Sequence, residues 1–595
     1  MKIQRSFGLT LVSSLGLAIL AIFGPLVSTG VAGRKSVPPV PVAAVLPASA
    51  ELAATAPGLA RLFDHFSVTE GLVFGRSVPA SEWEETLGFN PLSLSAWTER
   101  GIDIRRPTGL GLSDWMPRPD GGMDFAGLLC LPATDLETAR SAAREMAKRA
   151  FPDAVFAEEP PFFRFSSVAR GIEGAVGERD GHLLLAFGRG RSAMPLIRAA
   201  REGAVPLAEA EIRRIASARM GAKDDLLLLA DLEPLNRRLE EARAEGRKDG
   251  REDGYRSGDL SDRLVRYARA YRGVAAWMDL DAADLAIRWL ATPRENSPAR
   301  ELAGEVRRGR EPLLAVPSPP LLLSLGSLDP AAYLETLRSG MDPEARAAFE
   351  ARLAAWGADF GIDLERDAIG NLTGGFGFGV FDGIALNMAN YNTLVSLGVK
   401  DDAAARRTLA AAARHLADSG GLTVSSGSSP GRIGETEAVT VDFLGFLRIV
   451  AGVADGRFLL SVGERMFREA LTGGEPPAAP DPAVAEALRN DPAVFFLDVD
   501  ELVKASRNFA FLLSRFNRGR PVDDRTTEPL RNFRYVLSAA APANGDLLTG
   551  EFRVATRFSE PFFKGLRKVA DALVESRGGP DAPAPIDPSS PARSE

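Results

Sequence analysis

The side chains best suited to catalysis or metal binding are two carboxylates, Asp498 and Asp500, which are separated by one residue. On a strand, residues i and i+2 share a face, so both carboxylates could hold calcium or transfer a proton. The run lacks the glycine and terminal glutamate of a calcium loop. An aspartate that follows an apolar strand commonly caps the next helix, and we prefer this interpretation over catalysis.

Few histidines are available as general bases or metal ligands, because the chain has only His65, His182 and His415. None is spaced with a second histidine or a cysteine to bind zinc. His182 follows an Asp-Gly turn, so we expect an exposed hairpin residue. The sequence therefore predicts no catalytic residue, no metal site and no cofactor.

Aromatic residues are the more unusual feature, with 32 Phe against 6 Tyr and 6 Trp. Gly374–Gly379 alternates glycine and phenylalanine with period two, which is typical of a strand with one bulky and one bare face. The segments Pro160–Phe165 and Phe509–Phe516 carry more aromatic residues than a solvated surface needs. We favour a core role for them over a ligand-binding role.

Composition and charge exclude several function classes. The net charge is −8, without a basic stripe, which argues against nucleic acid and against anionic lipid headgroups. The single cysteine, Cys130, lies in an apolar run and has no partner for a disulfide, so we expect a buried thiol.

Two stretches of the chain are nearly the same, Gly101-Ile-Asp-Ile-Arg-Arg-Pro and Gly361-Ile-Asp-Leu-Glu-Arg-Asp. Further matches follow in the same order, and they pair Asp180-Gly181 with Asp455-Gly456 and Asp231 with Asp500. On that alignment Leu229 takes the place of Asp498. A repeat this long predicts a domain duplication rather than a solenoid, whose units run to roughly 20–50 residues.

We expect an α+β fold of two tandem homologous domains, at residues 44–310 and 311–575. Asp-Gly pairs at 120–121, 180–181, 382–383 and 455–456 are flanked by apolar or alternating runs, the strongest short-range hairpin signal. Each domain should therefore contain an antiparallel sheet of hairpins with helices packed on it.

The two ends of the chain have different compositions from its body. Lys2 and Arg5 precede an uncharged apolar stretch that ends near Gly33, which predicts a signal peptide or a signal anchor at residues 1–33. Residues 34–43 are proline-rich and read as an extended stalk. Residues 576–595 are polar and proline-rich, so we expect disorder there.

This arrangement of export signal, proline-rich stalk and two long repeats resembles a family of uncharacterised exported bacterial proteins that share a domain of unknown function. In that family, segments like Leu46-Pro47, Gly361-Ile-Asp-Leu-Glu-Arg and the glycine-alternating strand recur. The resemblance covers most of residues 44–575. It implies no activity and transfers no catalytic residue.

These observations favour an exported, non-enzymatic protein of the periplasm or another extracytoplasmic space, held in the inner membrane if the N-terminal segment is retained. Its partner would be an envelope protein or a hydrophobic ligand, and a cleft between duplicated domains is a common ligand site. Two alternatives remain open. One is a periplasmic hydrolase that uses Asp498 and Asp500, and the other is a lipid or lipoprotein carrier.

Overall fold

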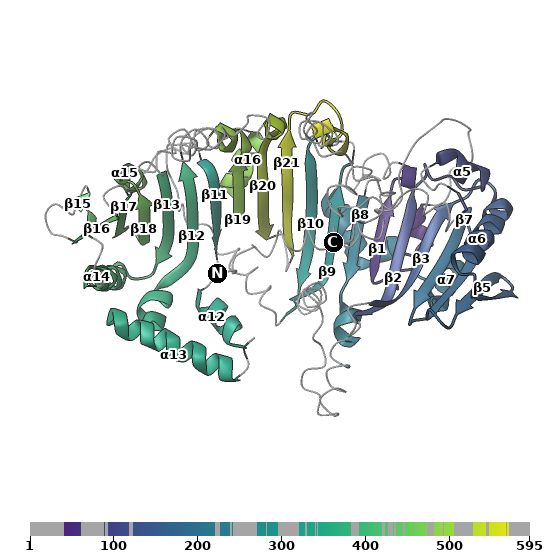
Figure 1. Ribbon diagram of the computed structural model, residues 1–595, viewed down its shortest axis with the longest axis horizontal. Coiled ribbons are helices and arrows are strands. Elements are labelled where there is room, and N and C mark those ends of the chain that lie inside the picture. The colour runs from purple at the N-terminus through teal and green to yellow at the C-terminus, as the bar shows by residue number, and fades with distance from the viewer. Residues whose placement is uncertain are drawn as a thin grey trace, which may run out of the picture.

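The computed structural model describes residues 41–569, with longer gaps at 61–87, 242–269, 296–319, 382–391 and 505–527 and several shorter ones. The predicted signal segment, most of the stalk, the boundary near residue 310 and the tail lie outside the described residues. The described chain forms one long antiparallel sheet with helices packed against it (Figure 1). The predicted combination of helices with antiparallel strands is confirmed.

The first half of the chain, residues 44–310, contributes ten strands and the helices between them. The elements are α2 (Val42–Val45), β1 (Leu52–Ala56), α5 (Leu94–Glu99), β2 (Thr108–Pro117), β3 (Met123–Pro132), α6 (Leu136–Ala150), β4 (Val155–Glu159), β5 (Phe162–Ser167), β6 (Ile172–Arg179), β7 (His182–Arg189), α7 (Met194–Glu202), η2 (Leu207–Glu209), α8 (Glu211–Met220), β8 (Leu226–Asp231), β9 (Tyr271–Met278) and β10 (Leu285–Pro293).

The second half, residues 311–575, contributes the remaining elements. They are β11 (Pro320–Ser327), α12 (Pro330–Ser339), α13 (Pro343–Phe360), η3 (Leu364–Ile369), β12 (Leu372–Phe381), β13 (Asn392–Val399), α14 (Asp402–Asp418), β14 (Thr423–Ser426), β15 (Arg432–Ile433), β16 (Thr436–Phe443), β17 (Leu447–Ala454), β18 (Arg457–Val462), α15 (Glu464–Thr472), α16 (Pro482–Asn490), β19 (Ala493–Asp498), η6 (Glu528–Asn532), β20 (Phe533–Pro542) and β21 (Leu548–Thr556).

The strand order in the two halves follows one plan. Backbone pairing gives β4-β5-β6-β7-β3-β2-β1-β8-β9-β10 in the first half. In the second half it gives β14-β16-β17-β18-β13-β12-β11-β19-β20-β21. The registers correspond as well, since Gly111 lies opposite Ala53 and Gly379 lies opposite Leu323.

The two halves meet where β10 pairs antiparallel with β21, so the two sheets expected from the sequence are joined into one. Arg288 lies opposite Glu551 in this junction, and Arg288 Nε is 3.1 Å from Glu551 Oε2. The registers of the flanking strands make these two residues counterparts of each other. The junction therefore resembles the two-fold interface of a dimer, with opposite charges at its centre.

Two of the predicted hairpins are confirmed by their turns. Asp180-Gly181 joins β6 to β7, and Asp455-Gly456 joins β17 to β18. The aspartates have φ of 50° and 52° and the glycines 79° and 72°. Positive φ at both central residues is the requirement of the hairpin turn that Asp-Gly favours. The pairs at 120–121 and 382–383 lie outside the described residues.

The sequence match between Gly101 and Gly361 is not a structural equivalence. In the first half the Gly101 carbonyl, just after α5, accepts the Thr134 N–H at 2.8 Å. In the second half, Lys400 takes the position of Thr134. Its N–H donates to the carbonyl of Asn371, just after η3, at 2.8 Å. Gly101 therefore corresponds to Asn371.

Helix α5 accordingly corresponds to η3. Ser93 caps α5 by accepting the Ala96 N–H, and Asp363 caps η3 by accepting the Arg366 N–H. Gly101 and Gly361 are alike for a local reason. Each follows the end of a helix, α5 or α13, with φ of 73° or 66°, a conformation that favours glycine.

Candidate functional site: an open apolar face in the second half

One face of the second half of the sheet carries large apolar side chains that are not fully covered. Phe376 and Leu397 are register partners, as are Phe378 and Val395. Phe458 lies opposite Leu397, and Phe495 and Phe378 are both opposite Ser324. Register partners point to the same side of a sheet. We call these six residues the open face: Phe376, Phe378, Val395, Leu397, Phe458 and Phe495.

Exposure distinguishes this face from its counterpart in the first half. Phe378 is 36% exposed, whereas Leu110, at the corresponding position of β2, is 6% exposed. The other five open-face residues are half-buried. Four of their first-half counterparts are buried, namely Thr108, Leu131, Leu183 and Leu228.

The first half is closed by side chains from outside the sheet. Leu94 and Trp97 of α5 are each 5% exposed and belong to the same core cluster as the face of β1 and β8. The Trp97 ring meets Phe89 edge to face at 5.0 Å. Alanines of α6 and the pair Phe562 and Phe563 belong to the same cluster. The result is a continuous core on this side.

Among the described residues of the second half, no helix inserts buried apolar side chains into this face as α5 does in the first half. Helical turn η3 occupies the place of α5, but it buries no residue. Asp367 stands where the first half has Trp97, and its carboxylate is 2.8 Å from Arg366 Nε. A carboxylate with a cationic partner gains nothing from insertion into an apolar face. Ala405 of α14, the counterpart of α6, forms a small cluster with Val399 of β13 and Val453 of β17, and Phe458 packs against this cluster at one edge of the open face.

In the sequence, α12 and α13 lie between β11 and β12, two neighbouring strands of the sheet, and they form an arm that lies apart from the sheet in Figure 1. The exposure of α13 is high along almost its whole length, and Trp356 is 59% exposed. Seven alanines favour the helix intrinsically, so α13 needs little packing to form.

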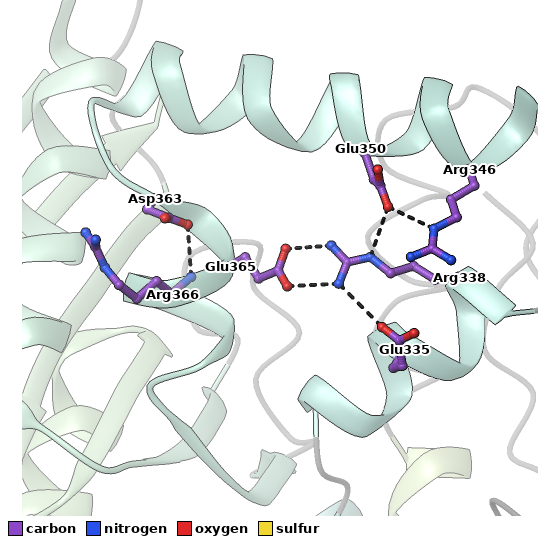
Figure 2. A network of polar contacts seen from close by, with 7 residues as sticks. All are labelled: Glu335, Arg338, Arg346, Glu350, Asp363, Glu365 and Arg366. Carbon is purple, nitrogen blue, oxygen red and sulfur yellow. Dashed lines mark hydrogen bonds and ion pairs between the residues drawn. The ribbon is translucent and has the colours of Figure 1, made fainter. Parts of the chain in front are cut away.

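A single guanidinium connects this arm to η3 (Figure 2). Arg338 of α12 donates to both carboxylate oxygens of Glu365, at 2.8 and 2.5 Å. It also lies 3.7 Å from Glu350 of α13 and 3.7 Å from Glu335. Mainly because of the hydrogen bond from Arg338, the pKa of Glu365 is lowered. Arg346 pairs only within α13, 3.0 Å from Glu350.

The candidate acid pair is engaged in local structure. Asp498 ends β19 as Asp231 ends β8, and each accepts a backbone N–H of the following turn, from Glu501 at 2.9 Å and from Glu233 at 3.0 Å. The matching of Asp231 with Asp500, and so of Leu229 with Asp498, is therefore wrong, because the register of β8 and β19 aligns Asp231 with Asp498.

The charges of the pair also differ from those of a catalytic dyad. Burial raises the pKa of Asp498. Asp500 instead accepts two hydrogen bonds from the Arg557 guanidinium, at 2.9 and 2.5 Å. Because Asp231 carries the same burial-raised pKa in the first half, Asp498 lacks the asymmetry expected of a site that only one repeat uses.

The histidines and the cysteine are distributed singly. His182 is 1% exposed, so its prediction as a surface residue is wrong; its ring lies against the core, and burial lowers its pKa. His415 packs on Phe360 with ring centroids 4.6 Å apart, and His65 lies outside the described residues. Cys130 is buried as predicted, and burial raises the pKa of its thiol.

Of the aromatic segments chosen from the sequence, Pro160–Phe165 does not form this face. Phe162, Phe163 and Phe165 are buried, so a core role is confirmed for Pro160–Phe165. Phe509–Phe516 lies outside the described residues. The alternation in Gly374–Gly379 was the useful signal: its phenylalanines share the open face. Only a comparison with Leu110 and Trp97 of the first half could have shown that they lack a cover.

The described part of the chain contains no helix long and apolar enough to cross a membrane. The same residues include no group of histidine, cysteine, aspartate and glutamate that could hold a metal ion.

Comparison with known proteins adds little. No protein-family model matches the chain, and no curated protein matches it. Solved structures of a protein designated TP0453, in crystal forms I, III and IV, are 6%, 10% and 9% identical to this chain, with TM-scores of 0.21, 0.20 and 0.20. They match 44%, 44% and 45% of this chain and 82%, 99% and 99% of their own. Likeness at this level carries no argument about fold or function.

Proposed function

We propose that this chain is an exported, non-enzymatic protein of the cell envelope that binds an apolar ligand on the open face of its second half. The observation that carries the proposal is the contrast in cover between the two halves. The face of the first half is covered by Leu94 and Trp97 of its own α5 and by Phe562, which follows β21, whereas the corresponding face of the second half leaves Phe378 36% exposed.

The chemistry of the open face favours hydrocarbon as the part of the ligand in contact. Its side chains are phenylalanine, valine and leucine, and the backbone groups of β12 and β13 are already paired with neighbouring strands. Five of the six residues are half-buried rather than widely exposed. A sheltered strip of this kind suits a slender chain, such as a lipid acyl chain, better than a broad protein surface.

An internal duplication accounts for this difference between the halves. Ten strands in the same order, equivalent registers and the central Arg288–Glu551 pair support an origin of the two halves from one ancestral domain. After duplication one copy can keep a closed core while the other opens. On this proposal the second half is the binding half, and the first is its stable support.

Export is supported by the sequence of the N-terminal 33 residues, where Lys2 and Arg5 precede the apolar stretch. On this proposal residues 41–569 are periplasmic or otherwise extracytoplasmic, either released by cleavage or tethered to the inner membrane. A lipid or lipoprotein carrier is the special case in which the ligand is passed on. The hydrolase alternative is less well supported, because Asp498 caps a turn and Asp500 pairs with Arg557.

Fluorescence titration with the fatty acid cis-parinaric acid tests the proposal. We expect saturable binding by the full-length protein and much weaker binding by Phe378→Ser. The matched control is Leu530→Ser, which removes an equally exposed leucine, 41% exposed, from η6. No saturable binding, or equal loss in both variants, would overturn the proposal. Native mass spectrometry of protein from an envelope extract would separate a co-purifying lipid from a bound protein.

A further inference from the structure

We propose that the α12–α13 arm is a lid that closes over an apolar chain bound on the open face, with Arg338 as the latch that holds it open. This inference rests on the proposed function and specifies how access to the site is controlled.

The position of the arm in the chain is the first argument. The arm lies between β11 and β12, and β12 carries Phe376 and Phe378 of the open face. In the first half, the segment between the equivalent strands β1 and β2 carries Leu59, Phe89, Leu94 and Trp97, all buried in the core that closes that half. The described part of this insertion thus contributes buried side chains to the face in the first half, whereas the open face of the second half keeps Phe378 36% exposed.

Among the described side chains, the arm is held by the ion pairs of Arg338, by the buried Leu334 of α12 and by the ring contact of Phe360. Helix α13 contacts η3 and α14 through its C-terminal end, where the Phe360 ring packs on His415. The bidentate pair between Arg338 and Glu365 ties α12 to η3. The Arg338 side chain is 13% exposed and that of Glu365 is 50% exposed, so water reaches and screens the pair, and a sufficiently large apolar contact can displace it.

The arm joins η3 through a glycine that could act as a hinge. Gly361 ends α13 with a left-handed φ of 66°, and no atom lies within 4 Å of the position a Cβ would take. Because glycine has no Cβ, this residue has access to a wider range of backbone angles than other residues, and a change of conformation would break the backbone hydrogen bonds from Gly361 N to Ala358 O and from Ile362 N to Gly357 O. Trp356, five residues before it, is 59% exposed and would leave water when the arm closes.

The test follows the solvent access of residue 356 while the site is filled. Trp356→Cys introduces a reactive thiol in a background where Cys130→Ala removes the buried one, and its rate of alkylation is measured with and without saturating cis-parinaric acid. We expect the probe to slow alkylation several-fold. The thiol of a Leu530→Cys control should react at the same rate in both conditions.

The latch is tested by Arg338→Gln, with Arg468→Gln as the matched control that removes an exposed arginine paired with Glu464 within α15. Release of the latch should tighten probe binding by about two- to fivefold, the range set by the worth of an exposed ion pair. The control should bind like the wild type. Unchanged alkylation at residue 356 in protein that binds the probe would overturn the lid alone. A protein that fails to bind the probe would instead overturn the proposed function.

Discussion

The two halves of this protein contribute strands in the same order to one sheet, and they differ in the side chains that cover one face of it. In the first half a six-residue helix, α5, inserts Leu94 and Trp97 into the core. In the second half η3 stands in the same place, and Asp367 takes the position of Trp97. The exchange of an aromatic ring for a carboxylate at this position is one of the differences between the closed core and the open face, while strand order and register remain the same.

The largest loss of unfolding free energy is expected from a variant that opens the closed half. Trp97→Ala removes a buried ring that meets Phe89 at 5.0 Å, and we expect a loss of about 3–5 kcal/mol of unfolding free energy. Trp356→Ala is the control, because its ring is mostly in water and its loss should change stability by less than about 0.5 kcal/mol. Urea denaturation measures both. Equal effects would contradict the assignment of closed and open halves.

A buried ion pair offers a second way to weaken only the first half. The Glu51 carboxylate accepts hydrogen bonds from Nη1 and Nη2 of Arg238, each at 2.6 Å. Leu321 stands at the corresponding position in the second half. Glu51→Ala should cost about 3 kcal/mol, since it leaves a partly buried arginine whose next carboxylate, Asp114, is 3.5 Å away. The control Glu159→Ala breaks an exposed pair and should cost less than about 1 kcal/mol.

A serine in the second half allows the opposite change. Ser396 corresponds to Cys130, is fully buried, and its hydroxyl has no hydrogen-bond partner. Ser396→Ala should therefore raise the unfolding free energy by about 1 kcal/mol. Ser461 is equally buried but donates to Gly463 O at 2.8 Å, so Ser461→Ala should not stabilise. A thermal shift assay distinguishes them, and stabilisation by both variants would argue against the hydrogen-bond explanation.

The junction between the halves should respond only weakly. Arg288→Glu places two carboxylates opposite each other across β10 and β21, and we expect a cost of about 0.5 kcal/mol. The double variant Arg288→Glu with Glu551→Arg restores opposite charges and should recover most of this loss. A double variant no better than the single one would show that the central pair does not contribute.

Acidification should release the arm. Because the hydrogen bond from Arg338 lowers the pKa of Glu365, the pair persists at neutral pH and is lost as the pH falls through that lowered pKa. Glu335 and Glu350 also face Arg338, each at 3.7 Å. Alkylation of the thiol in Trp356→Cys with Cys130→Ala, corrected for the pH dependence of thiol reactivity, should then change at acidic pH. An unchanged corrected rate would show that Arg338 does not position α13.

Hairpins and local caps could be predicted from the sequence because their signals are short. Asp180-Gly181 and Asp455-Gly456 form the expected turns, since those residues tolerate positive φ. The alignment of the halves was harder. Two helix ends both require a glycine, so Gly361 imitates Gly101 although Asn371 is the true counterpart. The burial of His182 and the exposure of Phe378 depend on what packs above the sheet, which no local pattern specifies.

The most direct test of the account is photolabelling of the full-length protein with a fatty acid that carries a diazirine on its chain, followed by peptide mapping. Binding on the open face predicts labels within residues 372–399 and 457–462 and none within 108–132 or 182–189, the equivalent strands of the closed half. Excess unlabelled fatty acid should abolish them. Equal labelling of the two halves, or labelling confined to the first, would contradict the claim that only the second half is open.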